Sequence, residues 1–529
     1  MTTAEAQQSH WEAPDQPEHG HGLLHRRNHH HKHRDDNIVG ISHHYGDVPY
    51  GDHEIVDAHS RKRLVILGGG TVGLTLANRL RARVSREELA IVIVDPRSYA
   101  QYPPFLPEAA AGSIEPRDVV APLRLALHGI DVLQARAEYI DHTNKTVVLD
   151  PEEGPAYRVH YDILVVALGS VSRTLPIPGL AESAIGFKNV EEGIAIRNRV
   201  INRMDVAASV TDRAERDRLL TFTFIGGGFA GIEAIAELED MARYACRSYP
   251  TISPSDLHFV MVEGAGRILP EVSEESGLYA QHELEQRGIK FYLNTFLNNC
   301  VDGKVVLSNG ETFESDTIVW TAGIKSNPLL TNGSDLPTDK LGRLMVLPTL
   351  QVTDADGNVI PDAWAAGDCA AVPDIVVGDG KFCPPNAQYA VREAKTMAHN
   401  IEESLYDGPL EDFRHKNVGV VASLGLRKGV AEFMGGKIKL RGWPAWLVHR
   451  AYHVYAMPTT KRKILILLGW LKQSLLGREI VSLGSVEDPR REFLKSAVPP
   501  PPRGVIVEQE PVVAAATSVS GKETLAPTA

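Results

Sequence analysis

The sequence predicts an α/β protein with two Rossmann-like dinucleotide-binding domains, followed by an amphipathic helical region near the C-terminal end. Three observations support this fold class. A glycine-rich strand–turn–helix pattern occurs twice, a matching segment follows each copy after a similar interval, and a basic, aromatic stretch interrupts a chain that is acidic elsewhere. Together they indicate a duplicated nucleotide-binding fold with an added region of different chemistry.

Length and composition are those of an ordinary folded protein and exclude one class of partner. The 529 residues allow two or three domains, and 43% of them are apolar. The formal net charge of −12 argues against nucleic acid as a partner, because phosphate binding needs a clustered basic surface. The four cysteines show neither CxxC spacing nor the density of a disulfide scaffold, which favours a reducing, cytoplasmic setting: Cys246, Cys300, Cys369 and Cys383.

The two ends of the chain differ from the rest. Residues 1–60 are polar and rich in histidine, and they contain no apolar stretch of the kind that a signal peptide needs. We expect this leader to be disordered and to hold no specific metal ion, because a histidine tract without fixed geometry does not define a metal site. The Pro- and Ala-rich tail, 496–529, is predicted to be extended and unpacked.

The first strand–turn–helix pattern lies between Arg63 and Leu80. An apolar run leads into a glycine-rich hexapeptide, and the leucines and alanines that follow have helical spacing. Such glycines allow a tight turn, close approach of a pyrophosphate to the backbone, and close packing of helix on strand. A second apolar strand then ends in an acid that can accept hydrogen bonds from a ribose. We therefore expect a dinucleotide at Gly68, Gly70, Thr71, Gly73 and Asp95.

The same pattern returns between residues 222 and 263. Its glycines and closing acid are Gly226, Gly228, Gly231 and Glu263. A loop rich in Pro, Ser and Thr, 248–256, explains the longer distance from the last glycine to the acid. An acid here favours the unphosphorylated ribose of NADH, although the nearby Arg267 leaves NADPH open. Two dinucleotide sites are thus implied.

Each glycine motif is followed by a second matching segment. Asp162 to Gly169 and Asp316 to Gly323 are both apolar strands with an Asp at the start and a Gly seven residues later. The interval from the first glycine of the motif to this later glycine is 101 residues in the first copy and 97 in the second. Whole units are therefore duplicated, and Gly169 and Gly323 are predicted to border the two sites.

With these motifs the sequence resembles the two-dinucleotide flavoprotein reductases of the FAD-dependent pyridine nucleotide-disulfide oxidoreductase superfamily. In that family the first unit binds FAD and the second, inserted within it, binds NAD(P)H. Residues 364–369 are similar to the family's late FAD motif, which Gly367 and Asp368 supply here. The resemblance implies the cofactors FAD and NADH, an FAD-binding domain over 61–185 and 320–415, and an NADH-binding domain over 186–319.

Residues outside the nucleotide motifs indicate the electron acceptor. The disulfide reductases carry a redox cysteine pair in their first or second unit, whereas residues 61–245 contain no cysteine. Residues 385–392 resemble the AQxAxQ quinone motif of the type II NADH:quinone oxidoreductases, with Ala387 and Gln388 retained and Arg392 replacing the last Gln. The resemblance implies a quinone site at Gln388 and Arg392. As an alternative, Gln388 caps a helix and Arg392 lies on its solvated face.

A basic, aromatic stretch, 437–478, has nine Lys or Arg residues and no Asp or Glu. Its longest apolar run is about eight residues, far short of the roughly 20 needed to cross a bilayer as a helix. Aromatic and aliphatic residues alternate there with basic ones, which is typical of amphipathic helices on an anionic membrane surface. Pro444 and Pro458 divide the stretch into two helices, as in the paired anchor helices that the resemblance implies for the C-terminal region 416–495. A homodimer interface, also implied by the resemblance, or a core-facing helix is the alternative.

The resemblance implies a non-proton-pumping NADH dehydrogenase that passes a hydride from NADH to FAD and then two electrons to a membrane quinone. Such an enzyme is a peripheral protein of the respiratory chain at the cytoplasmic face of the cell membrane. Residues 99–112 resemble the family's loop under the isoalloxazine ring, and Glu233 occupies the position of a functional Glu on the nicotinamide side of the flavin. Alternatively, Glu233 only stabilises the helix, because an acid is favoured in the first turn. Alternatives in function are a ferredoxin-type reductase, a sulfide:quinone reductase, or a flavin-bearing scaffold without turnover.

Overall fold

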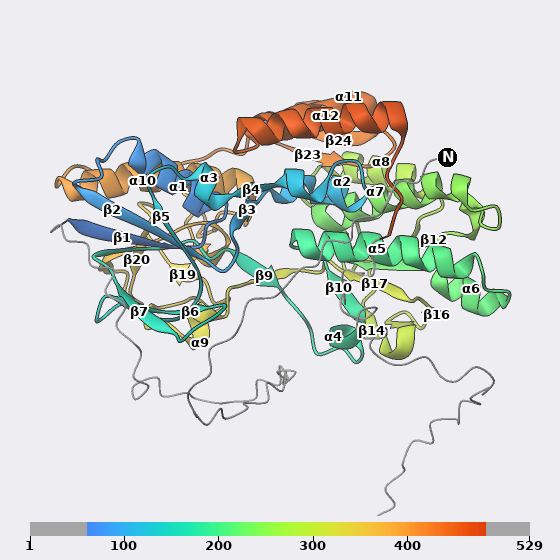
Figure 1. Ribbon diagram of the computed structural model, residues 1–529, viewed down its shortest axis with the longest axis horizontal. Helices are drawn as coiled ribbons and strands as arrows, with labels where there is room; N and C mark the ends of the chain where they lie inside the picture. The colour runs from blue at the N-terminus through green and yellow to red at the C-terminus, as the bar shows by residue number, and fades with distance from the viewer. Residues whose placement is uncertain (1–60, 483–529) are drawn as a thin grey trace, which may run out of the picture. The chain divides into compact units, whose positions relative to one another are not determined.

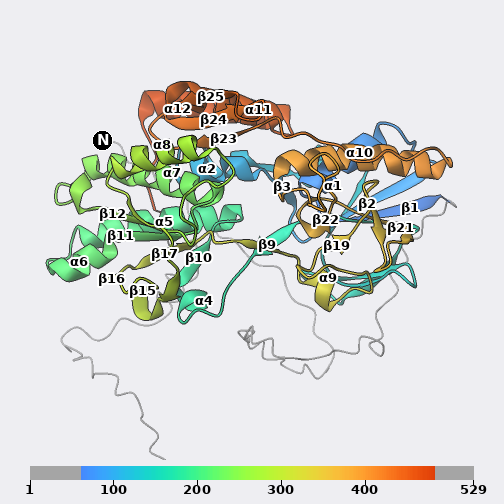
Figure 2. The same cartoon turned by 180° about the vertical axis from the view of Figure 1, so that it is seen from behind.

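Two mostly parallel sheets organise the part of the chain that the structure describes, residues 61–482 (Figures 1 and 2). The structure is a computed structural model. The predicted leader, 1–60, and the predicted tail, 496–529, lie outside the described residues and stay predictions. Within 61–482 the fold is α/β, as the sequence predicts.

The first sheet has eight strands. In spatial order they are β20 (Gln351–Thr353), β21 (Val359–Ala365), β8 (Ile163–Val166), β1 (Lys62–Leu67), β2 (Leu89–Asp95), β5 (Asp131–Asp141), β6 (Thr146–Pro151) and β7 (Tyr157–His160). Five neighbours, β21 to β5, run parallel, and the pairings at both edges are antiparallel. β2 and β8 are buried along their whole length and apolar except for Asp95 at the end of β2, as expected for parallel strands covered on both faces.

The second sheet has five strands, all parallel. In spatial order they are β10 (Ala184–Gly186), β17 (Thr317–Trp320), β11 (Thr221–Ile225), β12 (His258–Val262) and β13 (Lys290–Tyr292). The predicted domain boundaries, 185/186 and 319/320, therefore fall inside β10 and β17. The chain instead crosses between the sheets at β9 (Ser170–Ser172) and β18 (Ile324–Ser326), which pair antiparallel with each other. This crossing leaves β10 and β17 whole within the second sheet.

The helices that follow the glycine motifs occupy equivalent places. α1 (Thr71–Arg81) connects β1 to β2 and packs against α10 (Ala387–Leu405). α7 (Phe229–Ala245) connects β11 to β12 and packs against α5 (Val190–Ala207) and α2 (Leu106–Ala110). α5 begins with a capping box in which the side chain of Asn189 accepts from the amide of Glu192 and the side chain of Glu192 accepts from the amide of Asn189.

Short elements complete the two units. The helices are α3 (Leu123–Ala126), α4 (Leu180–Ser183), α6 (Arg213–Leu219), α8 (Glu274–Glu285) and α9 (Leu329–Asn332). The strands are β3 (Tyr99–Gln101), β4 (Val120–Pro122), β14 (Leu297–Asn299), β15 (Lys304–Leu307), β16 (Thr312–Glu314), β19 (Leu344–Met345) and β22 (Ala370–Ala371).

The C-terminal region forms a small antiparallel sheet and two helices. They are β23 (Gly419–Ser423), β24 (Gly429–Phe433), β25 (Ile438–Arg441), α11 (Trp443–Ala456) and α12 (Thr460–Leu476). Pro444 lies in the first turn of α11 and Pro458 separates the helices, as predicted from the sequence. Figure 1 shows α11 and α12 side by side above β23 and β24, and α11 contacts both strands. No helix within 61–482 is both long and apolar enough to span a membrane.

The C-terminal region shares the core of the second unit. Ala422, Val430 and Ile466 belong to the same buried apolar cluster as Phe222 of β11 and Leu238 of α7. Burial of these side chains stabilises the docked position of the C-terminal region by about 25 cal/mol for each Å² of apolar surface removed from water. The inner faces of α11 and α12 are therefore part of the fold, and only their outer faces are available to a partner.

Candidate active site

The first glycine loop lies where β1 ends and α1 begins. Gly68 has a φ of +107°, which glycine adopts without strain. The amide of Gly69 donates a hydrogen bond of 2.8 Å to Oδ2 of Asp95, and the amide of Arg97 donates one of 2.8 Å to Oδ1. Asp95, buried at the end of β2, thus ties the loop to the edge of the sheet.

The other two glycines of this loop have different roles. A Cβ at Gly73 would lie 1.9 Å from the carbonyl oxygen of Gly68, so the helix can approach the turn only without a side chain there. At Gly70, by contrast, no described atom outside the glycine and its chain neighbours lies within 4 Å of the position of a Cβ. No described side chain caps α1 at Gly70, and the first turn has no acid. An open helix N-terminus with unpaired amides is suited to bind a phosphate.

The second glycine loop repeats this geometry. Gly226 has a φ of +112°, and the amide of Gly227 donates a hydrogen bond of 2.5 Å to Oε2 of Glu263. A Cβ at Gly231 would lie 1.9 Å from the carbonyl oxygen of Gly226, and the Cβ position at Gly228 is open among the described residues. α7 also begins without a described side-chain cap and without an acid in its first turn. The duplication inferred from spacing therefore extends to individual hydrogen bonds.

Arg267 is held away from the ribose position by its own turn. Its guanidinium donates hydrogen bonds of 3.0 Å and 2.6 Å to the carbonyl oxygens of Val272 and Pro270. The carboxylate of Glu263 remains the charged group directly at the end of β12. This arrangement favours a ribose without a phosphate, which the sequence alone left open.

A cavity of about 1110 Å³ runs along the first glycine loop. Pockets for drug-sized ligands are usually about 300–1,000 Å³, so this cavity suits a larger ligand. Its lining includes the following predicted cofactor residues: Gly68, Gly70, Thr71, Asp95, Gly169, Gly367, Asp368 and Ala387. Gly73 packs behind the loop, and Gly323 lies at the equivalent edge of the second sheet, just after β17. The glycine cradle, the open helix end and the cavity together fit a bound FAD.

Two polar residues that the sequence analysis did not single out complete this cavity. Nζ of Lys188 donates a hydrogen bond of 2.8 Å to Oγ of Ser170, which in turn donates one of 2.6 Å to Oδ2 of Asp368. Nζ of Lys188 also lies 3.6 Å from Oδ2 of Asp368. All three residues line the cavity. No spacing in the sequence reveals this group, because its members are brought together only by the sheet crossing at β9.

Glu393 supports the same loop from behind. Its Oε2 accepts a hydrogen bond of 2.7 Å from the amide of Gly367, and the side chain is almost fully buried. Burial raises the pKa of Glu393 to about 7, with a smaller contribution from the nearby carboxylate of Asp368. The group therefore changes charge close to neutral pH, directly beneath the late FAD motif.

Gln388 and Arg392 lie in the first turns of α10, which Asn386 caps by accepting from the amide of Tyr389. The side-chain amide of Gln388 donates a hydrogen bond of 3.1 Å to the carbonyl oxygen of Gly419, and its Oε1 accepts one of 2.8 Å from His415. The guanidinium of Arg392 donates to the carbonyl oxygen of Gln388 at 2.8 Å. The capping alternative for Gln388 is therefore wrong, because its side chain holds the segment that leads into β23.

The sequence predicts Glu233 in the first turn of its helix. In the structure it lies in the second turn of α7, because the helix begins at Phe229. The residue is buried, and its Oε1 accepts a hydrogen bond of 2.8 Å from the amide of Ser423. The same oxygen lies 3.1 Å from Nε2 of His449 on α11. The helix N-terminus thus does not explain this acid, and its carboxylate faces the C-terminal region.

Strand β23 connects the two predicted catalytic residues. Gln388 bonds to Gly419, the first residue of β23, and Glu233 bonds to Ser423, its last residue. Four residue steps in a strand span about 13 Å. The structure therefore brings both residues to one strand, at opposite ends, although 155 positions separate them in the sequence.

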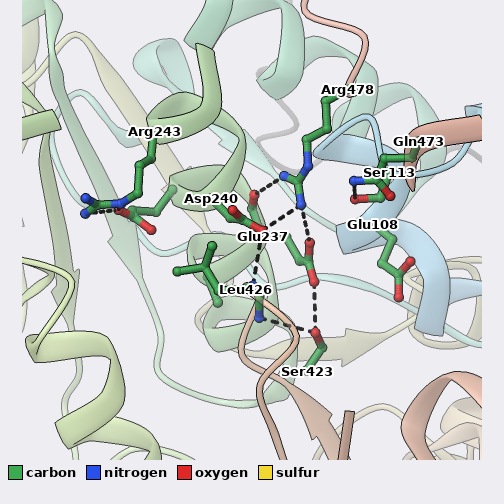
Figure 3. Close-up of polar contacts among 12 residues, drawn as sticks. Glu108, Ser113, Glu237, Asp240, Arg243, Ser423, Leu426, Gln473 and Arg478 are labelled. Atoms are coloured by element: carbon green, nitrogen blue, oxygen red, sulfur yellow. Dashed lines mark hydrogen bonds and ion pairs between the residues drawn. The ribbon is translucent and has the colours of Figure 1, made fainter. Parts of the chain in front are cut away.

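Buried acids also follow Glu233 along α7, and Figure 3 shows the polar contacts of two of them, Glu237 and Asp240. Glu237 accepts a hydrogen bond of 2.8 Å from Oγ of Ser423, and Asp240 accepts one of 2.6 Å from the guanidinium of Arg478. Burial, and next the carboxylate of Glu108, raise the pKa of Glu237. Figure 3 shows Arg478 pointing toward both Glu237 and Asp240, so the end of the C-terminal region is tied to α7.

The basic stretch finds many of its partners within the protein. Arg450 pairs with Glu108, which is 1% exposed, at 3.0 Å. Five further basic residues of 437–478 contact acids of the described chain: Lys439, Arg441, Arg462, Lys472 and Arg478. Of the nine basic residues, six therefore face the protein's own carboxylates. The excess of basic residues in this stretch is therefore explained mainly by docking of the C-terminal region onto the protein. Three basic residues remain for an external partner.

The cysteines are not arranged for disulfide chemistry. All four are free and buried. Burial raises the pKa of the Cys369 and Cys383 thiols to about 12 and also raises those of Cys246 and Cys300. A buried thiol that stays protonated is a poor nucleophile. The four cysteines therefore do not supply a reactive pair.

Known proteins identify the class that this fold and these sites define. Residues 62–394 match the family described as pyridine nucleotide-disulphide oxidoreductase. The chain belongs to this family and is an oxidoreductase. Within it, the type II NADH:quinone oxidoreductase of Staphylococcus epidermidis is 31% identical over 386 residues, which cover 72% of this chain and 92% of that protein. The chain therefore belongs to the type II NADH:quinone oxidoreductase family, and the family assignment made from the sequence is confirmed.

Solved structures show the same fold. NDH2 from Plasmodium falciparum, solved in complex with NADH, has a TM-score of 0.73 at 17% identity and covers 80% of this chain and 100% of its own. The sulfide:quinone oxidoreductase of Aquifex aeolicus has a TM-score of 0.59 at 17% identity over 79% of this chain and 96% of its own. The α/β dinucleotide-binding flavoprotein fold is thus confirmed.

Proposed function

We propose that this protein is a non-proton-pumping NADH dehydrogenase that passes a hydride from NADH to FAD and two electrons to a membrane quinone. One observation carries the proposal: the chain holds two glycine loops of the same geometry, each bonded to its own acid, in a member of the type II NADH:quinone oxidoreductase family. A flavin-bearing scaffold protein without catalytic turnover would not need a second dinucleotide-binding loop. The buried, protonated cysteines argue against an acceptor that needs thiol chemistry.

FAD is held by the first unit, 61–185 and 320–415. Gly70 and Thr71, at the open end of α1, would hold its pyrophosphate, Asp95 would hold a ribose, and Gly367 and Asp368 supply the late motif. Gly68 and Gly73 shape the turn, and Gly169 and Ala387 line the same cavity. The bound flavin supplies the two-electron chemistry, while these residues orient it and exclude water.

NADH is held by the second unit, 186–319. Its pyrophosphate lies at Gly226, Gly228 and Gly231 and its ribose at Glu263, with Gly323 at the edge of the site. Glu233 is the acid on the nicotinamide side. Its buried carboxylate, facing β23 and α11, supports a role in the reaction over a role in helix stability.

The quinone head group binds near Gln388 and Arg392. The side-chain NH2 group of Gln388 has two N–H donors and one of them is bonded to Gly419, so the second can donate to a quinone oxygen. Nε2 of His415, 2.8 Å from Oε1 of Gln388, is a further donor beside it, and burial and the charge of Arg392 lower the pKa of His415. His415 therefore joins the candidate quinone residues.

The exposed outer faces of α11 and α12 support binding of the protein to a membrane surface. Large apolar side chains are exposed there: Trp443, Leu447, Tyr455, Ile464, Leu467, Leu468, Leu471, Leu475 and Leu476. Apolar side chains and lysines on an amphipathic helix favour binding to anionic lipid. We assign this face to the cytoplasmic side of the cell membrane, as part of a respiratory chain, with the free cysteines supporting a reducing compartment. A homodimer through part of the same region is compatible with this exposure.

Stopped-flow absorbance near 450 nm tests the electron path. NADH should bleach the flavin of the purified protein, and a soluble quinone should restore the colour rapidly. The variant Glu233→Gln should slow bleaching by NADH much more than it lowers thermal stability. Bleaching that quinone cannot reverse would move the function to another acceptor, and normal bleaching in Glu233→Gln would remove that residue from the reaction.

Liposome flotation tests the membrane face. Replacing Leu468, Leu471 and Leu475 by Glu should release the protein from vesicles that contain anionic lipid, because three exposed apolar contacts are replaced by like charges. Leu341→Glu is the matched control, since Leu341 is 68% exposed and lies outside the C-terminal region. Retained binding in the triple variant would contradict the assignment. Sedimentation of the same variants reports whether this face also makes a dimer.

A further inference from the structure

A phenylalanine ring lies exposed beside the acid of the second glycine loop. Phe296 is 63% exposed, whereas its chain neighbours Thr295 and Leu297 are 3% and 4% exposed. Single exposed apolar side chains are common on protein surfaces, so exposure alone does not indicate a ligand. The place of this ring in the sheet and the way its backbone is held are the observations that do.

Gly264, the residue after Glu263, leaves room for the ring. A Cβ at Gly264 would lie 2.5 Å from Cε1 of Phe296 and 3.1 Å from its Cδ1 and Cζ. Gly264 is not among the glycines with a positive φ, so the turn geometry does not require glycine there. The missing side chain instead allows the ring to lie directly against the backbone beside Glu263.

Hydrogen bonds hold the backbone around Phe296 from two sides. The amide of Thr295 donates a hydrogen bond of 3.0 Å to the carbonyl oxygen of Glu263. The amide of Phe296 donates one of 2.9 Å to Oγ of Ser308, and the amide of Ser308 donates one of 2.9 Å to the carbonyl oxygen of Phe296. The exposed ring therefore stands on an ordered support, and a ligand that binds to it pays little entropy to order the loop.

Three neighbouring strands present the glycine loop, the acid and the ring in spatial order. β11 ends at the glycine loop, β12 ends at Glu263, and β13, next to β12, leads to Phe296. Ligands of open parallel sheets bind at the carboxyl ends of the strands. The adenosine half of a dinucleotide has its parts in the same order, which is pyrophosphate, ribose and base. A ribose at Glu263 thus directs its base toward β13 and the ring.

We propose that the ring of Phe296 is the platform on which the adenine of NADH stacks. This inference rests on the proposed function, in which the second unit holds NADH. Adenine and phenylalanine both offer a flat π face, and stacking removes apolar surface of both from water. Because a phenyl ring makes no hydrogen bond to the edge of a base, Phe296 recognises that the base is present and flat. It therefore selects for the adenosine half of the electron donor.

Binding of ADP-ribose to the flavin-loaded protein tests this platform without turnover. ADP-ribose carries the adenine, ribose and pyrophosphate of NADH but no nicotinamide. Phe296→Ser should raise its dissociation constant by about 5- to 150-fold, which corresponds to the loss of one base–aromatic stack. Leu278→Ser is the matched control, since Leu278 is 56% exposed on α8 of the same unit. Unchanged affinity in Phe296→Ser, or an equal loss in Leu278→Ser, would overturn the inference.

A second electron donor separates stacking from a general loss of function. Reduced nicotinamide mononucleotide lacks the adenosine half, so Phe296→Ser should raise the KM for NADH but leave flavin bleaching by the mononucleotide within about twofold of wild type. Equal losses with both donors would contradict the platform. If NADH does not bleach the unaltered protein, or quinone does not restore its colour, the proposed function fails, and ADP-ribose binding alone decides the role of Phe296.

Phe296→Trp is the conservative variant and supplies a spectroscopic signal. Indole keeps a flat face, so the dissociation constant of ADP-ribose should stay within about threefold of wild type. A base stacked on indole quenches its fluorescence. ADP-ribose should therefore lower the emission of Phe296→Trp by more than that of the unaltered protein, whose six tryptophans form the background. Equal quenching in the two proteins would show that the base does not lie on this side chain and would refute the platform.

Discussion

Replacing Gly228 by Ala distinguishes two roles of the glycines in the second loop, which are to allow the fold of the loop and to leave space for the pyrophosphate. The backbone at Gly228 has φ −72° and ψ −176°, which any residue adopts, and no described atom outside the residue and its chain neighbours lies within 4 Å of the new Cβ. Ala lowers the conformational entropy of the unfolded chain and so stabilises the fold by about 0.4–1 kcal/mol, whereas Ala is a poorer helix N-cap than Gly by a similar amount. We therefore expect the free energy of unfolding to change by less than about 1 kcal/mol.

The effect on NADH should be much larger than the effect on folding. The new methyl group occupies the space in front of the N-terminal amides of α7, where the pyrophosphate is expected. Hydrogen bonds to charged groups contribute about 1.5–3 kcal/mol each. The loss of one such bond corresponds to an increase of about 10- to 100-fold in the dissociation constant of NADH.

Gly70→Ala is the matched variant in the first unit, because its Cβ position is equally open. The assay measures flavin content from the absorbance of the purified protein and NADH affinity from titration. Gly228→Ala should keep its flavin and lose NADH affinity, and Gly70→Ala should be purified with little flavin. An unchanged NADH affinity in Gly228→Ala, or flavin loss in that variant alone, would refute the assignment of the two units.

Two further predictions concern stability. Arg450→Met leaves Glu108 buried without its cation and should lower the free energy of unfolding by about 3–5 kcal/mol in urea titrations. The control Lys472→Met removes an exposed pair with Glu115 and should lower the free energy of unfolding by only about 0–1 kcal/mol. Equal effects of the two variants would contradict the docking role of Arg450. Between pH 4.5 and 7 Glu393 keeps a proton in the folded protein that it has lost in the unfolded chain. The free energy of unfolding should therefore fall by about 3 kcal/mol as the pH rises through that window. Glu393→Gln should remove this dependence when urea midpoints are compared at pH 5 and 8, and parallel pH curves for both proteins would exclude it.

Much of the fold could be predicted because its signals are local. The glycine motifs specify a turn and the start of a helix within six residues, and the apolar runs that flank them specify buried parallel strands. The family, the enzyme class and the cofactors FAD and NADH follow from those motifs and are confirmed. The helix pair after Pro444 was also predicted, since proline acts on the backbone beside it.

The environment of the candidate site could not be predicted in the same way. Glu233 was identified by its motif position, but its contacts with Ser423 and His449 join residues about 190 and 216 positions away. The basic stretch was expected to find its partner outside the protein, and most of its charges instead pair with acids such as Glu108. Residue type and spacing do not show which distant side chain will face a charge.

The sequence by itself determined that the chain has two nucleotide-binding units and an amphipathic C-terminal region, because turn geometry and the period of apolar residues are properties of neighbouring positions. Only the tertiary structure decided that β23 joins Gln388 to Glu233 and that α11 places His449 against Glu233. Those contacts depend on docking the C-terminal region onto α7, and the free energy of docking comes from packing across the whole interface, which no short segment encodes.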